Sequence, residues 1–248
     1  MVGESISCAL RFLEGVSSRE KGLQLGKVFD VEIAAESGTV RGVLYRVEGA
    51  RGALLMVGGA GGGLHGPAGI YEQLSLRLQR DGVAALRLEY RLPNNLRECV
   101  HDVVAGIEAL KGEGIERVAL LGWSFGGAVV IDAGAQSEKV VGVATVASQT
   151  YGADAVSELS PKSLLLIHGT ADAVLPDRCS RDLYRNARQP KELLLYEGDN
   201  HGITNHVAEM LSKLHQWSLD LLKEKREDQP ERERDSRKKD GQATKEIR

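Results

Sequence analysis

The serine at position 124 stands between two glycines, in the pentapeptide G-W-S-F-G of residues 122–126. An apolar, strand-like run precedes this pentapeptide, and a helical pattern follows it directly. Small residues on both sides let the backbone turn sharply between a strand and a helix, so that the hydroxyl is exposed at the helix N-terminus. The pattern predicts a nucleophile for acyl transfer. The alternative is a strand-to-helix loop in which the serine only caps the helix.

An acid and a base follow Ser124 along the chain. Asp172 comes just after the apolar run of residues 163–169, and His201 comes after the run of residues 192–198. Because the carboxyl ends of parallel strands meet at one edge of a sheet, we expect these three side chains to converge there. The serine would attack a carbonyl, the histidine would move the proton, and the aspartate would orient the imidazole. Taken singly, the acid could be a turn residue and the histidine an ordinary loop residue.

An acyl-transfer site also needs N–H donors for the negative oxygen of its intermediate. The backbone N–H of Phe125, at the start of the helix, is one expected donor. The glycine-rich residues 58–66 are expected to supply the second, because glycines leave backbone N–H groups unobstructed. We assign the second donor to Ala60, with its neighbours Gly59 and Gly61 as alternatives that would also contact the substrate.

Two aromatic side chains and one histidine complete the predicted site. Trp123 and Tyr151 are candidates to flank the substrate, although aromatic residues at strand ends also serve as packing residues. His168, inside the string H-G-T-A-D, is expected to brace the loop of Asp172. Residues 148–162 form too short a segment for a lid domain, so we expect an open cleft that takes small esters.

Alternating apolar and helical patterns predict the elements that hold these residues. Residues 28–35 and 40–47, joined at Ser37-Gly38, predict an antiparallel hairpin. Six apolar runs then predict strands and five helical patterns predict helices: the strands are residues 53–58, 83–90, 117–122, 140–147, 163–169 and 192–198, and the helices are residues 68–81, 95–111, 125–135, 177–187 and 203–222. Since parallel crossovers need helices and both sheet faces must be buried, we expect an α/β fold with a doubly wound, mostly parallel sheet and helices on both faces.

The two ends of the chain differ from this core. Residues 5–15 space three apolar side chains for one helical face, so residues 1–26 are expected to form a helical extension that packs on the body of the domain. Residues 1–222 would then make up one domain. Residues 223–248 are dense in charges of both signs and almost lack apolar side chains, which predicts a solvated, disordered tail.

Composition and charge exclude several classes of protein. The chain has 248 residues, 42% of them hydrophobic, and 32 Lys+Arg against 35 Asp+Glu, which fits one globular domain and gives no overall charge for nucleic-acid binding. It shows no apolar run that could cross a membrane and no secretory signal, so we expect a cytoplasmic protein. Cys8, Cys99 and Cys179 have neither disulfide nor zinc spacing, and no histidines cluster, so we expect neither metal nor cofactor.

The strings GWSFGG, HGTADAVLP and GDNHGI, in this order, resemble those of the α/β-hydrolase superfamily, particularly its small dienelactone-hydrolase-like and serine-esterase branches. The resemblance runs from about residue 28 to residue 222 and includes LRLEYR, which is similar to an Asp-Tyr-Arg run of that superfamily. It implies Ser124 as nucleophile, Asp172 as acid and His201 as base. Dienelactone hydrolases carry cysteine in place of this serine, which points away from their narrow activity, and their relatives' usual His-Gly before the oxyanion residue is Gly58-Gly59 here.

The residues together predict a carboxylesterase that cleaves small esters through an acyl-enzyme on Ser124. A thioesterase, a peptidase or an acyltransferase would use the same residues, and a non-catalytic scaffold of this fold is a further alternative. Residues 61–66 also fit the glycine spacing of a dinucleotide-binding loop, with Glu89 ending the next strand, but that interpretation leaves the serine, acid and histidine unexplained. We expect a small-molecule ester as ligand, and neither nucleic acid nor a membrane as partner.

Overall fold

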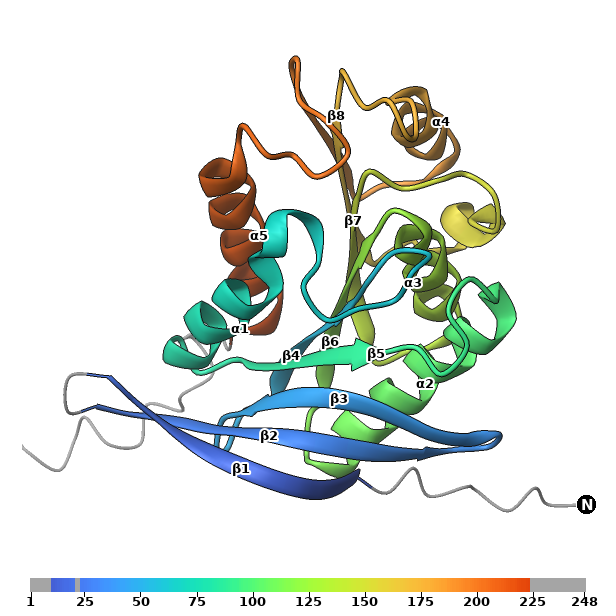
Figure 1. The fold of residues 1–248 in the computed structure, drawn as a ribbon. Coiled ribbons are helices and arrows are strands. Elements are labelled where there is room, and N and C mark those ends of the chain that lie inside the picture. Colours follow the sequence, from blue (N-terminus) through green and yellow to red (C-terminus); the bar gives the residue numbers. More distant parts are fainter. Residues whose placement is uncertain (1–9, 21–22, 224–248) are drawn as a thin grey trace, which may run out of the picture.

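The computed structural model describes residues 10–20 and 23–223. Their strands form one mixed sheet (Figure 1). The strands are β1 (Leu10–Glu20), β2 (Leu23–Ala35), β3 (Gly38–Arg46), β4 (Gly52–Val57), β5 (Ala84–Glu89), β6 (Arg117–Trp123), β7 (Val140–Val146), β8 (Ser163–Gly169) and β9 (Lys191–Tyr196). They lie in the order β1-β2-β3-β5-β4-β6-β7-β8-β9. Pairing is antiparallel from β1 to β5 and parallel from β5 to β9, so the carboxyl ends of the parallel strands share one edge.

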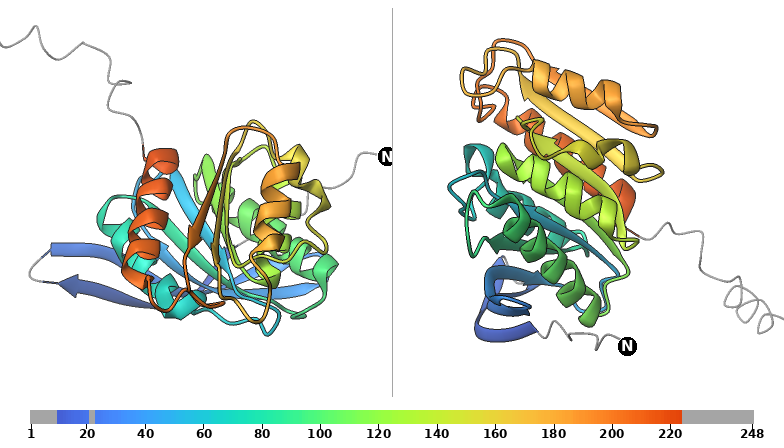
Figure 2. Two further views of the ribbon diagram at one scale, coloured as in Figure 1. Left: turned by 90° about the horizontal axis from the view of Figure 1, so that it is seen from above. Right: turned by 90° about the vertical axis from the view of Figure 1, so that its right-hand side faces the viewer.

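Helices cover both faces of this sheet. In the described residues they are α1 (Ile70–Arg80), α2 (Leu96–Gly112), α3 (Phe125–Gln136), α4 (Arg178–Asn186) and α5 (Val207–Leu222). α1 and α5 lie together on one face, and α2, α3 and α4 lie on the other, as the two views of Figure 2 show. An apolar core fills the space beneath each helix layer.

Strand β4 shows why the central parallel strands are mainly apolar. All six of its residues are buried. Ala53, Leu55 and Val57 face the core beneath α2 and α3, whereas Leu54 and Met56 face the core beneath α1 and α5. Because side chains alternate between the two faces of a strand, a strand that is covered on both faces is apolar on both.

The predicted doubly wound, mostly parallel sheet is confirmed, with each predicted strand and helix of the core present and small shifts at their ends. The hairpin is also confirmed, as β2 and β3. Its turn consists of Glu36 and Ser37, because Ala35 pairs with Gly38. The turn therefore lies one residue earlier than predicted, and Gly38 follows it with a φ of +135° that a side chain would disfavour.

The helical extension predicted for residues 1–26 is wrong where the structure describes it, because residues 10–20 form the strand β1. β1 pairs antiparallel with β2 along its length. Phe12 packs edge-on against Phe29, with 4.8 Å between ring centroids, and the Arg46 guanidinium lies 5.6 Å from the Phe12 ring. A short isolated helix is marginal in water, so pairing with a long neighbouring strand wins over the helical spacing.

Three further predictions concern the charged tail, the lack of a lid domain between β7 and β8, and the lack of a membrane-spanning segment. Residues 1–9, 21–22 and 224–248 lie outside the described residues, and with them most of the predicted tail. Between β7 and β8 the chain forms one short 3-10 helix, η2 (Asp154–Glu158), so the predicted lack of a lid domain there is confirmed. Within the described residues, no helix combines the length and apolar character needed to cross a bilayer.

Candidate active site

Ser124 occupies the sharp turn between β6 and α3. Its backbone has a positive φ of +56° with a ψ of −121°, which is not helical, and its side chain makes no hydrogen bond that would cap α3. Two backbone hydrogen bonds hold the turn. The Ser124 N–H donates to the Val146 carbonyl oxygen at 2.8 Å, and the Gly127 N–H donates to the Ser124 carbonyl oxygen at 3.0 Å. Strained residues that are held by their surroundings cluster at functional sites. A simple capping role does not account for this serine.

Two glycines make room for the turn. A Cβ on Gly122 would lie 2.1 Å from the Gly126 carbonyl oxygen, and a Cβ on Gly126 would lie 2.2 Å from the Gly58 carbonyl oxygen. Both obstructing atoms belong to the backbone, which cannot swing aside as the end of a side chain can. The close approach of β6, α3 and the loop after β4 therefore requires the G-x-S-x-G spacing.

Gly126→Ala is expected to destabilise the fold. The new methyl group would push α3 away from Gly58, lowering the free energy of unfolding by about 1–3 kcal/mol in a denaturant titration. Gly112→Ala is the control, because a Cβ at that position of α2 meets no atom within 4 Å. Equal unfolding free energies for the two variants would contradict the close packing at Gly126.

Asp172 and His201 are hydrogen-bonded to each other beyond the ends of β8 and β9. His201 Nδ1 lies 2.7 Å from Asp172 Oδ2. Asp172 Oδ1 accepts the backbone N–H groups of Val174 at 2.8 Å and Leu175 at 2.9 Å, and the carboxylate side chain has no exposed surface. Such a carboxylate keeps the proton of the histidine on Nδ1, which leaves Nε2 as a base.

The protonation of Asp172 follows from its surroundings. Burial raises the pKa of the carboxyl group, but the hydrogen bond from His201 and the N–H groups of Leu175 and Val174 outweigh burial, so the pKa lies below its ordinary value. The carboxyl group is therefore ionised at neutral pH. An ionised partner can stabilise the positive charge that His201 would acquire when it takes up a proton.

Trp123 links the turn of Ser124 to the loop of His201. Its Nε1–H donates to the His201 backbone oxygen at 3.1 Å, and the two rings lie 5.5 Å apart, centroid to centroid. The residue next to the serine therefore contacts the loop of the histidine, and the Ser124 hydroxyl makes no hydrogen bond with any described residue. Catalytic hydrogen bonds are often long until substrate binds. The contacts of Trp123 are those of a packing residue, and its contact with substrate stays a prediction.

The glycine-rich loop after β4 lies directly against Ser124. A Cβ on Gly59 would be 3.5 Å from the Ser124 Cβ. The following residues form a tight turn in which the Gly62 N–H donates to the Gly59 oxygen at 3.0 Å. Ala60 is exposed at the corner of this turn, and a Cβ on Gly61 would face open space. The loop can supply a second N–H donor beside the α3 N-terminus, and the choice among its residues stays a prediction.

Glu89 holds this loop from the end of β5. Its Oε1 accepts the Gly63 N–H at 2.8 Å, and the neighbouring Tyr90 hydroxyl donates to the Gly58 oxygen at 3.3 Å. A Cβ on Gly62 would lie 2.5 Å from the same carboxylate oxygen. The spacing of the glycines and Glu89 also fits a dinucleotide-binding loop. These contacts explain that spacing by the structure of the loop itself.

Asp199, two residues before His201, fixes the loop that carries this histidine. Its side chain is buried, Oδ1 accepts the N–H groups of Asn200 at 2.9 Å and Asn205 at 3.2 Å, and Oδ2 accepts the His206 N–H at 3.1 Å and lies 2.8 Å from His206 Nδ1. One carboxylate thus binds both ends of the loop. The sequence pattern does not single out Asp199, and an acid in a loop beside the predicted base is its only signal.

Exposed apolar side chains gather at the same edge. Tyr151, Leu92 and Val174 are exposed to 80%, 53% and 68%, and they follow β7, β5 and β8, respectively. The loop of Tyr151 is packed on α2, since a Cβ on Gly152 would lie 2.3 Å from Leu96 Cδ2. The predicted contact of Tyr151 with substrate is open to solvent and stays a prediction.

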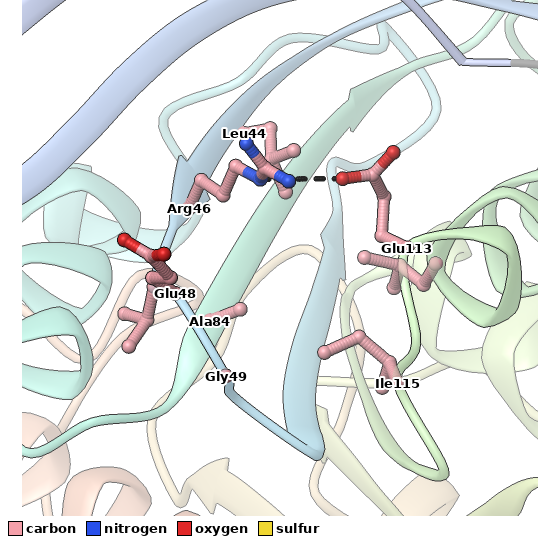
Figure 3. Close-up of a pocket in the computed structure, with 9 residues that line it drawn as sticks. Leu44, Arg46, Glu48, Gly49, Ala84, Glu113 and Ile115 are labelled. Atoms are coloured by element: carbon pink, nitrogen blue, oxygen red, sulfur yellow. Dashed lines mark ion pairs between the residues drawn. The ribbon is translucent and has the colours of Figure 1, made fainter.

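A separate pocket, drawn in Figure 3, lies at the opposite edge of the sheet, where β4 and β5 begin. The ion pair between Arg46 Nε and Glu113 Oε2, 3.2 Å long, crosses it. It includes none of the candidate residues. Within the described residues, no group of three or more His, Cys, Asp or Glu side chains is arranged to hold a metal ion.

Comparison with known proteins adds to this geometry. No family model matches the chain. Uncharacterized protein YfhR from Escherichia coli K12 is 31% identical over 109 residues, which cover 35% of this chain and 38% of YfhR, so the match spans well under half of the relative's length. The dienelactone hydrolase from Anabaena variabilis superposes with a TM-score of 0.70 at 19% identity, over 79% of this chain and 98% of its own. XC6422 from Xanthomonas campestris, a lidless α/β serine hydrolase, superposes with a TM-score of 0.62 at 16% identity, over 77% of this chain and 93% of its own.

Proposed function

We propose that this chain, which has the α/β-hydrolase fold, is a serine hydrolase that cleaves small carboxylic esters. The observations that support the proposal are the hydrogen-bonded pair of Asp172 and His201, the bond from Trp123 to the His201 backbone, and the strained backbone of the next residue, Ser124, which no capping bond explains. Solved structures of the same fold include hydrolases and esterases, which supports the reaction class. Their low identity leaves the substrate to be argued from the site.

The reaction would run in two steps through an ester of Ser124. His201 Nε2 takes the hydroxyl proton while Oγ attacks the carbonyl carbon, and the same proton passes to the alkoxide as the bond to it breaks. Water, activated by His201, then attacks the acyl-enzyme and releases the acid. Asp172 orients the imidazole and stabilises its charged form, and the Phe125 N–H, with an N–H of Ala60 or of its neighbours Gly59 and Gly61, would bind the negative oxygen.

Small esters are favoured because no lid domain between β7 and β8 is present to cover a long acyl chain. The segment between β7 and β8 is short and holds only the turn of η2, and Tyr151 is open to solvent. A long acyl chain would therefore stay mostly hydrated, and each added methylene would contribute little binding energy.

The dependence of rate on chain length tests this substrate class. We expect kcat/KM for p-nitrophenyl esters to stay flat or fall from butyrate to dodecanoate. A chain that is buried gains about 0.8 kcal/mol per methylene, or roughly fourfold in kcat/KM. A steep rise along the series would show a covered acyl tunnel and would overturn the assignment to small esters.

Other reactions can use the same groups. Thioesterase, peptidase and acyltransferase activity differ from esterase activity in the leaving group or the acceptor, so matched ester, thioester and anilide substrates of one acyl group separate them. A non-catalytic scaffold would turn over none of these and would leave Ser124 unreactive.

A further inference from the structure

The carboxylate of Asp172, the proposed catalytic acid, lies within hydrogen-bond distance of two histidines. His201 Nδ1 lies 2.7 Å from Asp172 Oδ2, and His168 Nε2, at the end of β8, lies 3.1 Å from the same oxygen. His168 Nδ1 lies 2.7 Å from the hydroxyl oxygen of Ser180 on α4. His168 and Ser180 are both fully buried. A continuous chain of hydrogen bonds therefore runs from α4 through β8 and Asp172 to the loop after β9.

The partners of His168 decide which of its nitrogens carries the proton. Nε2 lies within hydrogen-bond distance of two acceptors that have no proton to give, the Asp172 carboxylate and, at 3.0 Å, the Leu175 carbonyl oxygen. Nε2 must therefore be protonated. Ser180 can then donate its hydroxyl proton to Nδ1, which satisfies a neutral imidazole completely. No positive charge is needed on this buried ring.

We propose that His168 is a positioning residue that tunes the base strength of His201 by donating a second N–H to Asp172 Oδ2. The inference rests on the proposed function, because it acts only if His201 is the base. The second donor takes up part of the negative charge of Oδ2, so less of that charge is available to stabilise a protonated His201. It also holds the carboxylate in the plane that His201 needs. Bracing of the loop alone would include neither effect.

Few other charged groups face Asp172 and its two histidines. From α4, Cys179 is the titratable neighbour; burial and then the charges of Asp182 and Asp172 raise the pKa of its thiol, so the group is neutral near pH 7. On the loop of His201, the carboxylate of Asp199 is engaged with the N–H groups of its own loop. Loss of the His168 donor should thus be felt mainly by His201.

His168→Met and His168→Gln test the proposal as a matched pair in the full-length chain. Methionine fills similar space without a donor, whereas the amide nitrogen of glutamine can reach the place of Nε2 and donate there. We expect the acid limb of the kcat/KM profile to move to higher pH by about 0.5–1 unit in His168→Met, with kcat lowered about tenfold and KM unchanged. His168→Gln should restore both toward wild type.

Ser180→Ala provides a second route if His168→Met does not fold. Without the hydroxyl donor to Nδ1, His168 becomes a weaker donor at Nε2, and the acid limb should shift in the same direction by less. Superimposable pH profiles for wild type, Ser180→Ala and any folded His168→Met would overturn the inference. Loss of the proposed function itself would look different, because Ser124→Ala would then hydrolyse esters as fast as wild type.

Discussion

Replacing Ser124 with alanine should lower kcat/KM for a small ester by about 10⁴-fold or more and leave the chain folded. The loss is large because the acyl-enzyme cannot form without Oγ, and the remaining N–H donors and histidine act on water only weakly. Folding should survive, because the serine side chain makes no hydrogen bond in the described residues, while its backbone bonds to Val146 and Gly127 remain. Steady-state kinetics and a thermal melt measure the two effects.

Ser137→Ala is the matched control for this prediction. Ser137 follows the C-terminal end of α3, whereas Ser124 precedes its N-terminal end, and among the described residues the Ser137 hydroxyl accepts only the Lys139 N–H, at 3.3 Å. Its loss should leave kcat/KM within about twofold of wild type, as for most surface changes. A Ser124→Ala enzyme with the kinetics of Ser137→Ala would show that another residue carries the activity.

Asp172→Asn has the second largest expected effect, a fall in kcat of about 10³- to 10⁴-fold with little change in KM. An amide can turn its NH₂ toward His201 Nδ1, which would favour the tautomer whose proton is on Nε2 and block the base; the fall of about 10⁴ for the corresponding change in a serine protease sets the scale. The surface change Asp220→Asn, which affects a hydrogen bond with Gln216, is the control. Wild-type kcat in Asp172→Asn would remove Asp172 from the mechanism.

The same substitution has a predicted signature in stability. The pKa of Asp172 is lower in the folded chain than its ordinary value, so the ionised carboxyl group stabilises the fold above that ordinary value, and this stabilisation is lost as the pH falls through the lower, folded value. Asp172→Asn should lack this acid-dependent loss. Unfolding free energies compared at neutral and acidic pH measure the difference between the two proteins.

The sheet and its helices could be predicted because the central strands β4 to β8 are covered on both faces. An apolar run bounded by helical patterns has few other folded arrangements, and β4 is buried at every position. Ser124, Asp172 and His201 could be placed at one edge for the same reason, since each follows the carboxyl end of a parallel strand. The α/β-hydrolase resemblance is confirmed for the fold.

Features that depend on contacts between distant segments could not be predicted. β1 is a strand because β2 offers a long partner, a fact that the local spacing of its apolar residues does not contain. The Ser180 hydroxyl lies against His168 because of how α4 packs on the sheet, and Asp199 is buried because its loop closes on it. Neither polar residue has a periodic or motif signal in the sequence.

Intact mass after incubation with a fluorophosphonate tests the central claim most directly. An activated serine forms a bond to phosphorus as fluoride leaves, so wild type should gain the mass of one phosphonyl group, while folded Ser124→Ala should gain none. A folded wild type that gains no mass, or an equal gain in both proteins, would contradict the assignment of Ser124 as the nucleophile.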